Sequence, residues 1–233
     1  MNIKIIYEDN HVLVVEKPCN VPSQKDNTGD VDMTDMVGEY LREKYNKKGN
    51  VYVGLVHRLD RPVGGIMIFA KTSKAASRLC DCIRRNKISK RYLAVLSGTL
   101  KEKEGTLLDY LVKDKKANKV FVVKKGTLNA KEAILKYKVV KEVDNLSLVM
   151  VELITGRSHQ IRVQFKNAGA SLYGDKRYGS DVSNKRQQIA LWSYEISFEH
   201  PTKREVMTFS TVPNWSYTPW KLFYPNVSLG NIS

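Results

Sequence analysis

The segment VHRLDRPVGGIMIFAK, residues 56–71, places a single carboxylate among cations. Asp60 follows His57 and Arg58 and immediately precedes Arg61, and an apolar run begins shortly afterwards. A lone acid in this setting can act as a nucleophile or as a base, because nearby positive charge favours its ionised form. The same cations would hold an anionic substrate. The segment therefore predicts chemistry on an anion that depends on Asp60.

A second segment, VELITGRSHQIRVQF at residues 151–165, could supply a partner for this acid. Its pattern predicts a strand followed by a helix that starts at Arg157 or Ser158 and runs to Asn167. The first turn of a helix attracts phosphate or carboxylate through its free N–H groups. If Arg157 reaches Asp60, its guanidinium fork would fix the carboxylate and keep it ionised. The alternative is a purely structural ion pair, but a loop between buried strands favours function.

The charge balance indicates the class of partner. The 233 residues include 39 Lys and Arg against 24 Asp and Glu, a formal net charge of +15 spread along the chain. The usual partner of such a surface is a polyanion, most often nucleic acid, and a merely soluble basic protein is the alternative. With 42% hydrophobic residues, the chain can form one compact domain or two closely packed lobes.

Compartment and metal content follow from the same composition. No apolar run approaches the roughly 20 residues of a membrane span, and the N-terminus becomes acidic too early for a signal peptide. We therefore expect a cytoplasmic protein. Cys19, Cys80 and Cys82 are odd in number and lack the second pair of a zinc site, so we expect free thiols and no metal.

Hydrophobic spacing predicts the elements that position the two segments. Residues Ile3–Tyr7 and Val12–Val15 form a predicted hairpin at a sheet edge. The HRLD residues form a loop between predicted strands at Val51–Val56 and Gly65–Lys71. The second of these is apolar throughout, which predicts burial on both faces.

The remaining pattern indicates the fold class. One helix should run from Met33 to the Lys47–Asn50 turn, and another should be capped by Ser73 and reach Asn86. Residues 113–119 look like a basic hairpin. Further strands are predicted at Lys90–Leu96, Lys119–Val123, Ala133–Val140, Leu146–Ile154, Ile189–Phe198 and Glu205–Thr211. Successive strands without intervening helices predict an α+β fold with a mainly antiparallel sheet.

Five motifs give the chain a family resemblance: VVEKP at 14–18, HRLD at 57–60, KRYLA at 90–94, GRSHQIR at 156–162 and GDKRYG at 174–179. In this order and at these spacings they resemble RluA-type RNA pseudouridine synthases, from about Ile6 to Phe209. The resemblance implies the pseudouridine synthase fold, a mainly antiparallel mixed sheet flanked by helices, with the active-site cleft across the sheet. It also implies one catalytic domain over residues 1–233 without a separate RNA-binding domain.

The activity implied by the resemblance is isomerisation of uridine in RNA without a cofactor. Asp60 would start cleavage of the N-glycosidic bond, either by attacking the anomeric carbon or by removing a proton from the 2′ carbon. The detached uracil would then turn and rejoin the sugar through carbon 5. Arg157 would pair with Asp60, and Tyr92 would stack on the base and assist proton removal from carbon 5. A core tyrosine is the alternative for Tyr92.

The resemblance also suggests residues that contact RNA. Arg58 would fill the space left by a flipped base, or contact phosphate. His57, His159, Gln160 and Arg162 complete this set; the two histidines and the glutamine should order the loop and the helix start rather than transfer protons. Candidates for the RNA backbone are Arg61, Lys71, Lys176 and Arg177, with solvated surface as the alternative. The implied substrate is a stem-loop of ribosomal or transfer RNA, bound by a monomer with no obligate protein partner and no membrane.

Two positions depart from the family pattern. Val63-Gly64-Gly65 replaces the more usual Thr-Ser-Gly, and Asn20 stands where glycine is common. Asparagine tolerates a left-handed turn, so the turn can survive. A non-catalytic RNA-binding or ribosome-assembly protein on the same fold is the competing function, and a nuclease built from His57 and His159 is a weaker one.

Overall fold

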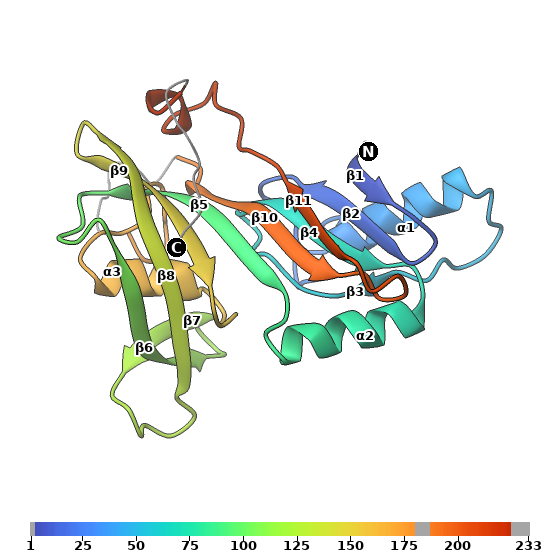
Figure 1. Cartoon of the computed structure of the whole chain (residues 1–233), viewed down its shortest axis with the longest axis horizontal. Helices are drawn as coiled ribbons and strands as arrows, with labels where there is room; N and C mark the ends of the chain where they lie inside the picture. The colour runs from blue at the N-terminus through green and yellow to red at the C-terminus, as the bar shows by residue number, and fades with distance from the viewer. Residues whose placement is uncertain (1–2, 180–186, 225–233) are drawn as a thin grey trace. The chain divides into compact units, whose positions relative to one another are not determined.

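The computed structural model describes residues 3–179 and 187–224. Their eleven strands and three α-helices fall into two compact units (Figure 1). The first unit comprises the chain up to Lys90 together with Ser193–Pro213, and the second comprises Arg91–Trp192 and the chain from Asn214. The predicted α+β class is confirmed. None of the described helices has the length and apolar character needed to cross a membrane.

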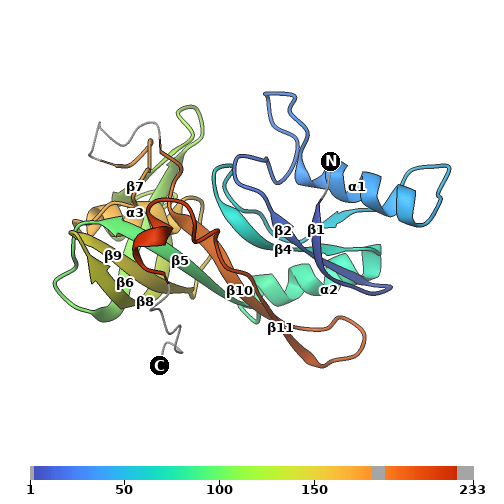
Figure 2. The same cartoon turned by 90° about the horizontal axis from the view of Figure 1, so that it is seen from above.

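The first unit is built on strands in the order β1-β2-β4-β10 (Figures 1 and 2). The strands are β1 (Lys4–Glu8), β2 (Val12–Lys17), β4 (Gly64–Ala70) and β10 (Leu191–Glu199), with β3 (Gly54–Leu55) paired to β4 and β11 (Val206–Ser210) paired to β10. The ladders β1–β2, β2–β4, β3–β4 and β10–β11 are antiparallel. Helices α1 (Met33–Lys44) and α2 (Ser73–Arg84) complete the unit.

Packing in the first unit explains why its elements form. Every residue of β4 is buried, as its apolar run predicts. Val14 of β2 and Ile68 of β4 pack with Leu79 of α2 in one core cluster. Asp32 caps α1 by accepting the N–H groups of Thr34 and Asp35.

Two boundary predictions in this unit are wrong. Only Gly54 and Leu55 of the predicted strand 51–56 pair with β4. The cap of α2 is Thr72 rather than Ser73, because Thr72 has the extended backbone and its hydroxyl accepts the N–H of Ala75 at 3.2 Å. The three cysteines are free, with Cys80 exposed and the other two half-buried.

The second unit has strands in the order β5-β9-β8-β6-β7. They are β5 (Ser89–Ser97), β9 (Leu146–Leu153), β8 (Lys131–Val143), β6 (Glu104–Asp114) and β7 (Lys119–Val123), followed along the chain by α3 (Gln160–Asn167) and a 3-10 turn at Trp220–Leu222. All four ladders are antiparallel. Val163 of α3 packs on Leu111, Val120 and Ala133 of the sheet.

Strand β6 is absent from the sequence prediction. Its residues EGTLLDYLVKD place Leu107 and Leu108 side by side and so break the alternation expected of a strand. The hairpin predicted at 113–119 is confirmed, since Lys113 pairs with Val120 and Asp114 with Lys119 across the β6–β7 turn.

Candidate functional site

Asp60 lies on a loop of the first unit whose backbone is anchored by a buried serine and a half-buried histidine. The Nε2 atom of His57 accepts the N–H of Ile68 in β4 at 3.1 Å. The hydroxyl of Ser23 donates to the carbonyl of Leu59 at 2.7 Å and accepts the N–H of the same residue at 3.0 Å. Asp60 itself is only partly exposed. The loop therefore presents its carboxylate from a fixed backbone.

The pKa of His57 favours an anchoring role over proton donation. Burial, with a smaller contribution from the charge of Lys90, lowers the pKa of His57 to about 3. A neutral ring agrees with the hydrogen bond, because Nε2 can accept the N–H of Ile68 only when it carries no proton. This arrangement supports the expectation that His57 orders the loop.

Lys17 is the residue of this site that motif reasoning missed. It lies at the end of β2, and it is fully buried. Its ammonium donates to three main-chain carbonyls, those of Val63 at 2.6 Å, Pro18 at 2.9 Å and Arg61 at 3.0 Å. Burial lowers the pKa of Lys17 to about 8, while the neighbouring Cys19 and Asp60 act in the opposite direction. A buried cation therefore joins the segment after β2 to the residues that follow Asp60.

The VVEKP motif already indicates that Lys17 has a structural role. A lysine that closes a strand of buried apolar residues must find acceptors, because an isolated buried ammonium is costly. The sequence does not show which acceptors these are, since Val63 lies 46 positions away.

The Val63-Gly64-Gly65 variant fits this arrangement. Val63 is buried, its N–H donates to the carbonyl of Asp60 at 2.9 Å, and its own carbonyl accepts from Lys17. Gly65 has a φ of +116°, and a Cβ there would lie 2.3 Å from the carbonyl oxygen of Ser193. Main-chain contacts therefore hold this part of the loop, and position 65 requires glycine.

The two arginines beside Asp60 differ in their surroundings. Arg58 is exposed. Arg61 donates to Thr28 at 3.0 Å and to the carbonyl of Asn20 at 3.2 Å, and it forms ion pairs with Asp26 and Asp30. Asn20 takes the expected left-handed conformation, with a φ of 67°.

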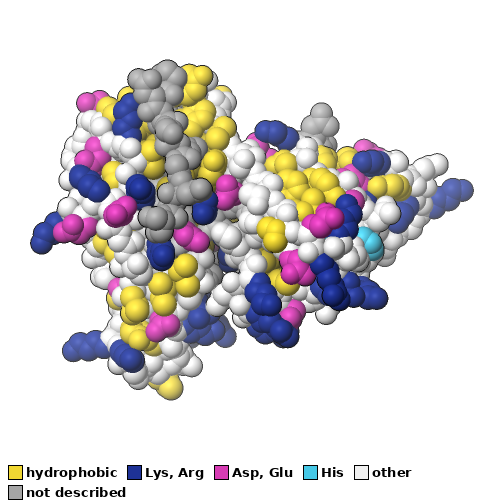
Figure 3. All heavy atoms as spheres, in the orientation of Figure 1, with side chains coloured by type: hydrophobic (Ala, Val, Ile, Leu, Met, Phe, Trp, Pro, Cys, Tyr) yellow, Lys and Arg dark blue, Asp and Glu magenta, His cyan; other side chains and the backbone are white. Residues whose placement is uncertain are grey.

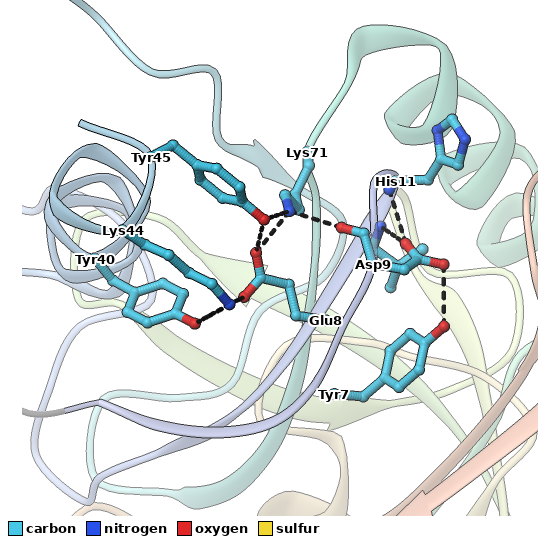
Figure 4. A network of polar contacts seen from close by, with 9 residues as sticks. Tyr7, Glu8, Asp9, His11, Tyr40, Lys44, Tyr45 and Lys71 are labelled. Carbon is cyan, nitrogen blue, oxygen red and sulfur yellow. Dashed lines mark hydrogen bonds and ion pairs between the residues drawn. The ribbon is translucent and has the colours of Figure 1, made fainter. Parts of the chain in front are cut away.

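Lys71, a candidate for RNA contact, is engaged inside the first unit (Figure 4). Its side chain is 10% exposed and donates to Glu8 and to the carbonyl of Asp9, both at 2.6 Å. The Glu8 carboxylate also accepts from three groups of α1 and its C-terminal cap: Lys44 at 2.6 Å, Tyr40 at 2.7 Å and Tyr45 at 2.7 Å. These contacts tie the end of β4 to β1 and α1, so they favour a structural role over an RNA contact.

Because of this network, the free energy of unfolding should depend on pH in the acid range. Burial acts to raise the pKa of Glu8, but the bonds from Lys44, Lys71 and the tyrosines outweigh it and lower that pKa from 4.5 to about 2. The contribution is therefore complete above pH 4.5 and lost as pH falls from 4.5 towards 2. We expect Glu8→Gln to reduce the free energy of unfolding at pH 7 by about 1–2 kcal/mol, with a smaller difference at pH 3.

Urea unfolding at both pH values measures this effect. Glu39→Gln is the control, because Glu39 is an exposed carboxylate of α1, the helix whose Tyr40 and Lys44 contact Glu8. An equal loss of stability at pH 7 and pH 3 would show that the ionised Glu8 network contributes nothing of its own.

The second unit holds the other two residues predicted to be catalytic. Tyr92 lies in β5, is 6% exposed and pairs with Val151 of β9. Arg157 is exposed, and its Nε donates to the carbonyl of Glu132 at 2.9 Å. Asp60 belongs to the first unit, so its predicted contacts with Tyr92 and Arg157 stay predictions.

The predicted start of α3 at Arg157 or Ser158 is wrong, because the helix begins at Gln160. The Gln160 side chain explains this, since its oxygen accepts the main-chain N–H of Arg157 at 2.9 Å and closes a turn before the helix. His159 then takes a left-handed conformation, with a φ of 52°. Arg157 therefore lies on a turn outside the helix.

Gln160 and Arg162 are buried, so their predicted RNA contacts are not supported by this structure. Gln160 donates to the carbonyl of Ile134 at 3.0 Å. Arg162 makes a two-pronged ion pair with Asp175, at 2.8 and 2.7 Å. Burial acts to raise the pKa of Asp175, but the Arg162 guanidinium outweighs it and keeps that pKa below its ordinary value. The pair joins the GRSHQIR and GDKRYG motifs.

The same two motifs meet again at His159, whose Nδ1 lies 2.7 Å from the hydroxyl of Tyr178. Lys176 and Arg177 are exposed, and Arg177 donates to the carbonyl of Asn118 in the β6–β7 turn.

Across residues 3–179 and 187–224, no cluster of three His, Cys, Asp or Glu side chains could hold a metal ion.

Comparison with known proteins complements this geometry. A family model described as RNA pseudouridylate synthase matches residues 11–167. An uncharacterized RNA pseudouridine synthase of Aquifex aeolicus is 32% identical over 220 residues, covering 89% of this chain and 68% of the relative. The ribosomal large subunit pseudouridine synthase C of Buchnera aphidicola is 32% identical over 205 residues, covering 85% and 63%.

A solved structure shares the fold. The human RNA pseudouridylate synthase domain containing 4 superposes with a TM-score of 0.77 at 20% identity, covering 91% of this chain and 89% of that one.

Proposed function

The chain belongs to the RNA pseudouridylate synthase family, and from this premise we propose that it converts specific uridines of ribosomal or transfer RNA to pseudouridine, with Asp60 starting the reaction. Membership agrees with the motif resemblance and makes the chain an RNA pseudouridine synthase, an isomerase. The observation that carries the role of Asp60 is the anchoring of its loop. His57 and Ser23 hold the backbone before Asp60, and Lys17 holds the backbone after it.

In the proposed reaction Asp60 breaks the bond between N1 of uracil and the ribose. It either forms a bond to the anomeric carbon, with uracil leaving as its anion, or takes a proton from the 2′ carbon as the base departs. The base then bonds to the anomeric carbon through carbon 5, which releases the Asp60 carboxylate from that carbon in the first route or returns the proton to the 2′ carbon in the second. Carbon 5 loses its hydrogen and N1 gains one. Substrate and product are isomers, so the step needs no external oxidant or co-reactant. The neutral His57 is consistent with a reaction that uses a single carboxylate.

The other predicted site residues would contact the target uracil and the phosphates beside it. We assign Arg157 as the cation that pairs with Asp60, and Tyr92 as the ring that stacks on uracil. A uridine inside a stem must leave the stack, which costs a few kcal/mol. Arg58 is exposed two residues before Asp60, a position from which it can fill the vacated space or bind phosphate.

Two observations support the choice of RNA. The printed name of the Buchnera relative refers to the ribosomal large subunit. The net charge of +15 suits a folded polyanion. The family match spans residues of both units, which supports one catalytic domain. A monomer is the simplest form for an enzyme that binds a folded RNA.

Pseudouridine mapping of total RNA tests the proposal. RNA from cells with and without the gene is compared, and the deletion is complemented with wild type or with Asp60→Asn. We expect one or a few sites to disappear and to return only with wild type. Sites restored by Asp60→Asn would contradict the role of Asp60, and an unchanged map would favour the non-catalytic RNA-binding alternative.

A further inference from the structure

Strands β6, β7 and β8 have a second face, opposite α3, that carries exposed apolar side chains. Directly paired residues share a face, and here Val112 pairs with Phe121 and Leu108 with Ile134. Phe121 is 49% exposed and Leu108 is 54% exposed. Tyr110, on the same face, is half-buried. We call these five residues the outer face; Figure 3 shows hydrophobic side chains over this part of the unit, with Lys, Arg and acidic side chains beside them.

The border of the outer face is strongly basic. Residues 113–136 contain eight lysines against two acids, although Lys113 and Lys131 pair with Val120 and Leu111 on the face that carries α3. Lys125 lies over the ring of Tyr110, with its Nζ 5.9 Å from the ring centre. Lys119 and Lys136 are exposed at positions whose strand neighbours lie on the outer face. Two aromatic rings are therefore bordered by lysines, and one carboxylate, that of Glu132, accepts from the Tyr110 hydroxyl at 3.4 Å.

The outer face is continuous with the turn that carries Arg157. The carbonyl that accepts from Arg157 belongs to Glu132, and Glu132 pairs with Tyr110. The exposed Ile154 donates its N–H to the carbonyl of Ile134 at 3.2 Å. RNA that contacts Arg157 can therefore extend onto Tyr110 and Phe121.

We propose that the outer face binds single-stranded RNA flanking the target uridine, with bases stacked on Tyr110 and Phe121 and phosphates held by the bordering lysines. The proposal rests on the proposed function and names a second contact for the same substrate. Bases stack on aromatic rings whatever their sequence, and lysines add a salt-dependent attraction.

Charge selects this occupant over a protein. The cores of protein interfaces are depleted of lysine, and a second copy of this chain would bring the same positive charge. RNA satisfies both the rings and the lysines.

Direct binding tests the outer face independently of catalysis. All variants are made in full-length Asp60→Asn protein, and the probe is a fluorescein-labelled, uridine-rich single-stranded RNA of about 16 nucleotides, with its duplex as the second probe. We expect Phe121→Ala and Tyr110→Ala each to weaken single-strand binding by about tenfold. Their effect on the duplex should be less than about twofold.

The control is Tyr217→Ala, which removes another exposed ring of the same unit and should change the affinity by less than about twofold. Lys125→Gln should reduce the slope of log K against log salt by about 0.7. Circular dichroism confirms that each variant is folded.

Three outcomes would overturn the proposal. The first is a loss no larger than that of Tyr217→Ala, and the second is an equal loss on the duplex. The third is a self-associated wild type that Phe121→Ala turns into monomers, which would make the outer face a protein interface. Pseudouridine formation by the parent enzyme is scored separately, so failure of the outer face and failure of the proposed activity give different results.

Discussion

Asp60→Asn is expected to slow pseudouridine formation by about 10⁴-fold or more, because the amide can neither attack the anomeric carbon nor take up a proton. The carboxamide has nearly the same size, and the hydrogen bonds that fix the loop come from Lys17, Ser23 and His57. We therefore expect the melting temperature to change by no more than about 2 °C and RNA affinity by less than about threefold.

Single-turnover release of tritium from RNA labelled at carbon 5 of uridine measures this loss directly, since that hydrogen leaves in the reaction. Asp60→Ala is the companion variant, because alanine cannot revert to aspartate by deamidation. Asp35→Asn, at an exposed carboxylate of α1, is the control. Near-normal turnover by Asp60→Ala would remove Asp60 from the mechanism.

Lys17→Met should be the second most damaging change. It leaves the carbonyls of Pro18, Arg61 and Val63 without their donor, and two of these lie within three residues after Asp60. A small displacement of a reacting group can cost about 100-fold in rate, so we expect kcat to fall by about that factor. Lys17 is fully buried and has no surface to offer RNA, so KM should change by less than about threefold.

Stability and activity should respond to Lys17 in opposite directions as pH rises. The pKa of Lys17 is about 8 in the folded protein against an ordinary 10.5, because burial disfavours its charge. Between these values the unfolded chain binds more protons, so this lysine's contribution to the free energy of unfolding rises with pH. Activity should fall above about pH 8, since a neutral amine cannot donate to all three carbonyls.

The pH profile of kcat separates positioning from simple packing. We expect an alkaline limb near pH 8 in wild type that is missing from the residual activity of Lys17→Met. Lys4→Met is the matched control, because Lys4 lies on the neighbouring strand with its side chain 66% exposed. If the Lys17→Met variant kept the kcat of the wild type, the position of the loop would not depend on this lysine.

The boundaries of regular elements were largely predictable because they depend on local pattern. The β1–β2 hairpin, the burial of β4 and the span of β7 follow from hydrophobic spacing alone. Strand β6 was missed because it carries adjacent leucines, and its pairing with β7 and β8 overrides the weak alternation. The start of α3 was misplaced because the Gln160 side chain closes a turn that no local pattern indicates.

By itself, the sequence determined which acid is the candidate catalyst and which family the chain belongs to, because both are carried by short contiguous motifs. Only the tertiary structure decided what the charged side chains around those motifs do. Lys17 contacts a carbonyl 46 positions away, Lys71 a carboxylate 63 positions away, and Arg162 an aspartate in a different motif. The physical reason is that a charge in a sequence can be solvated or buried, and burial is tolerated only where folding brings its partners to it.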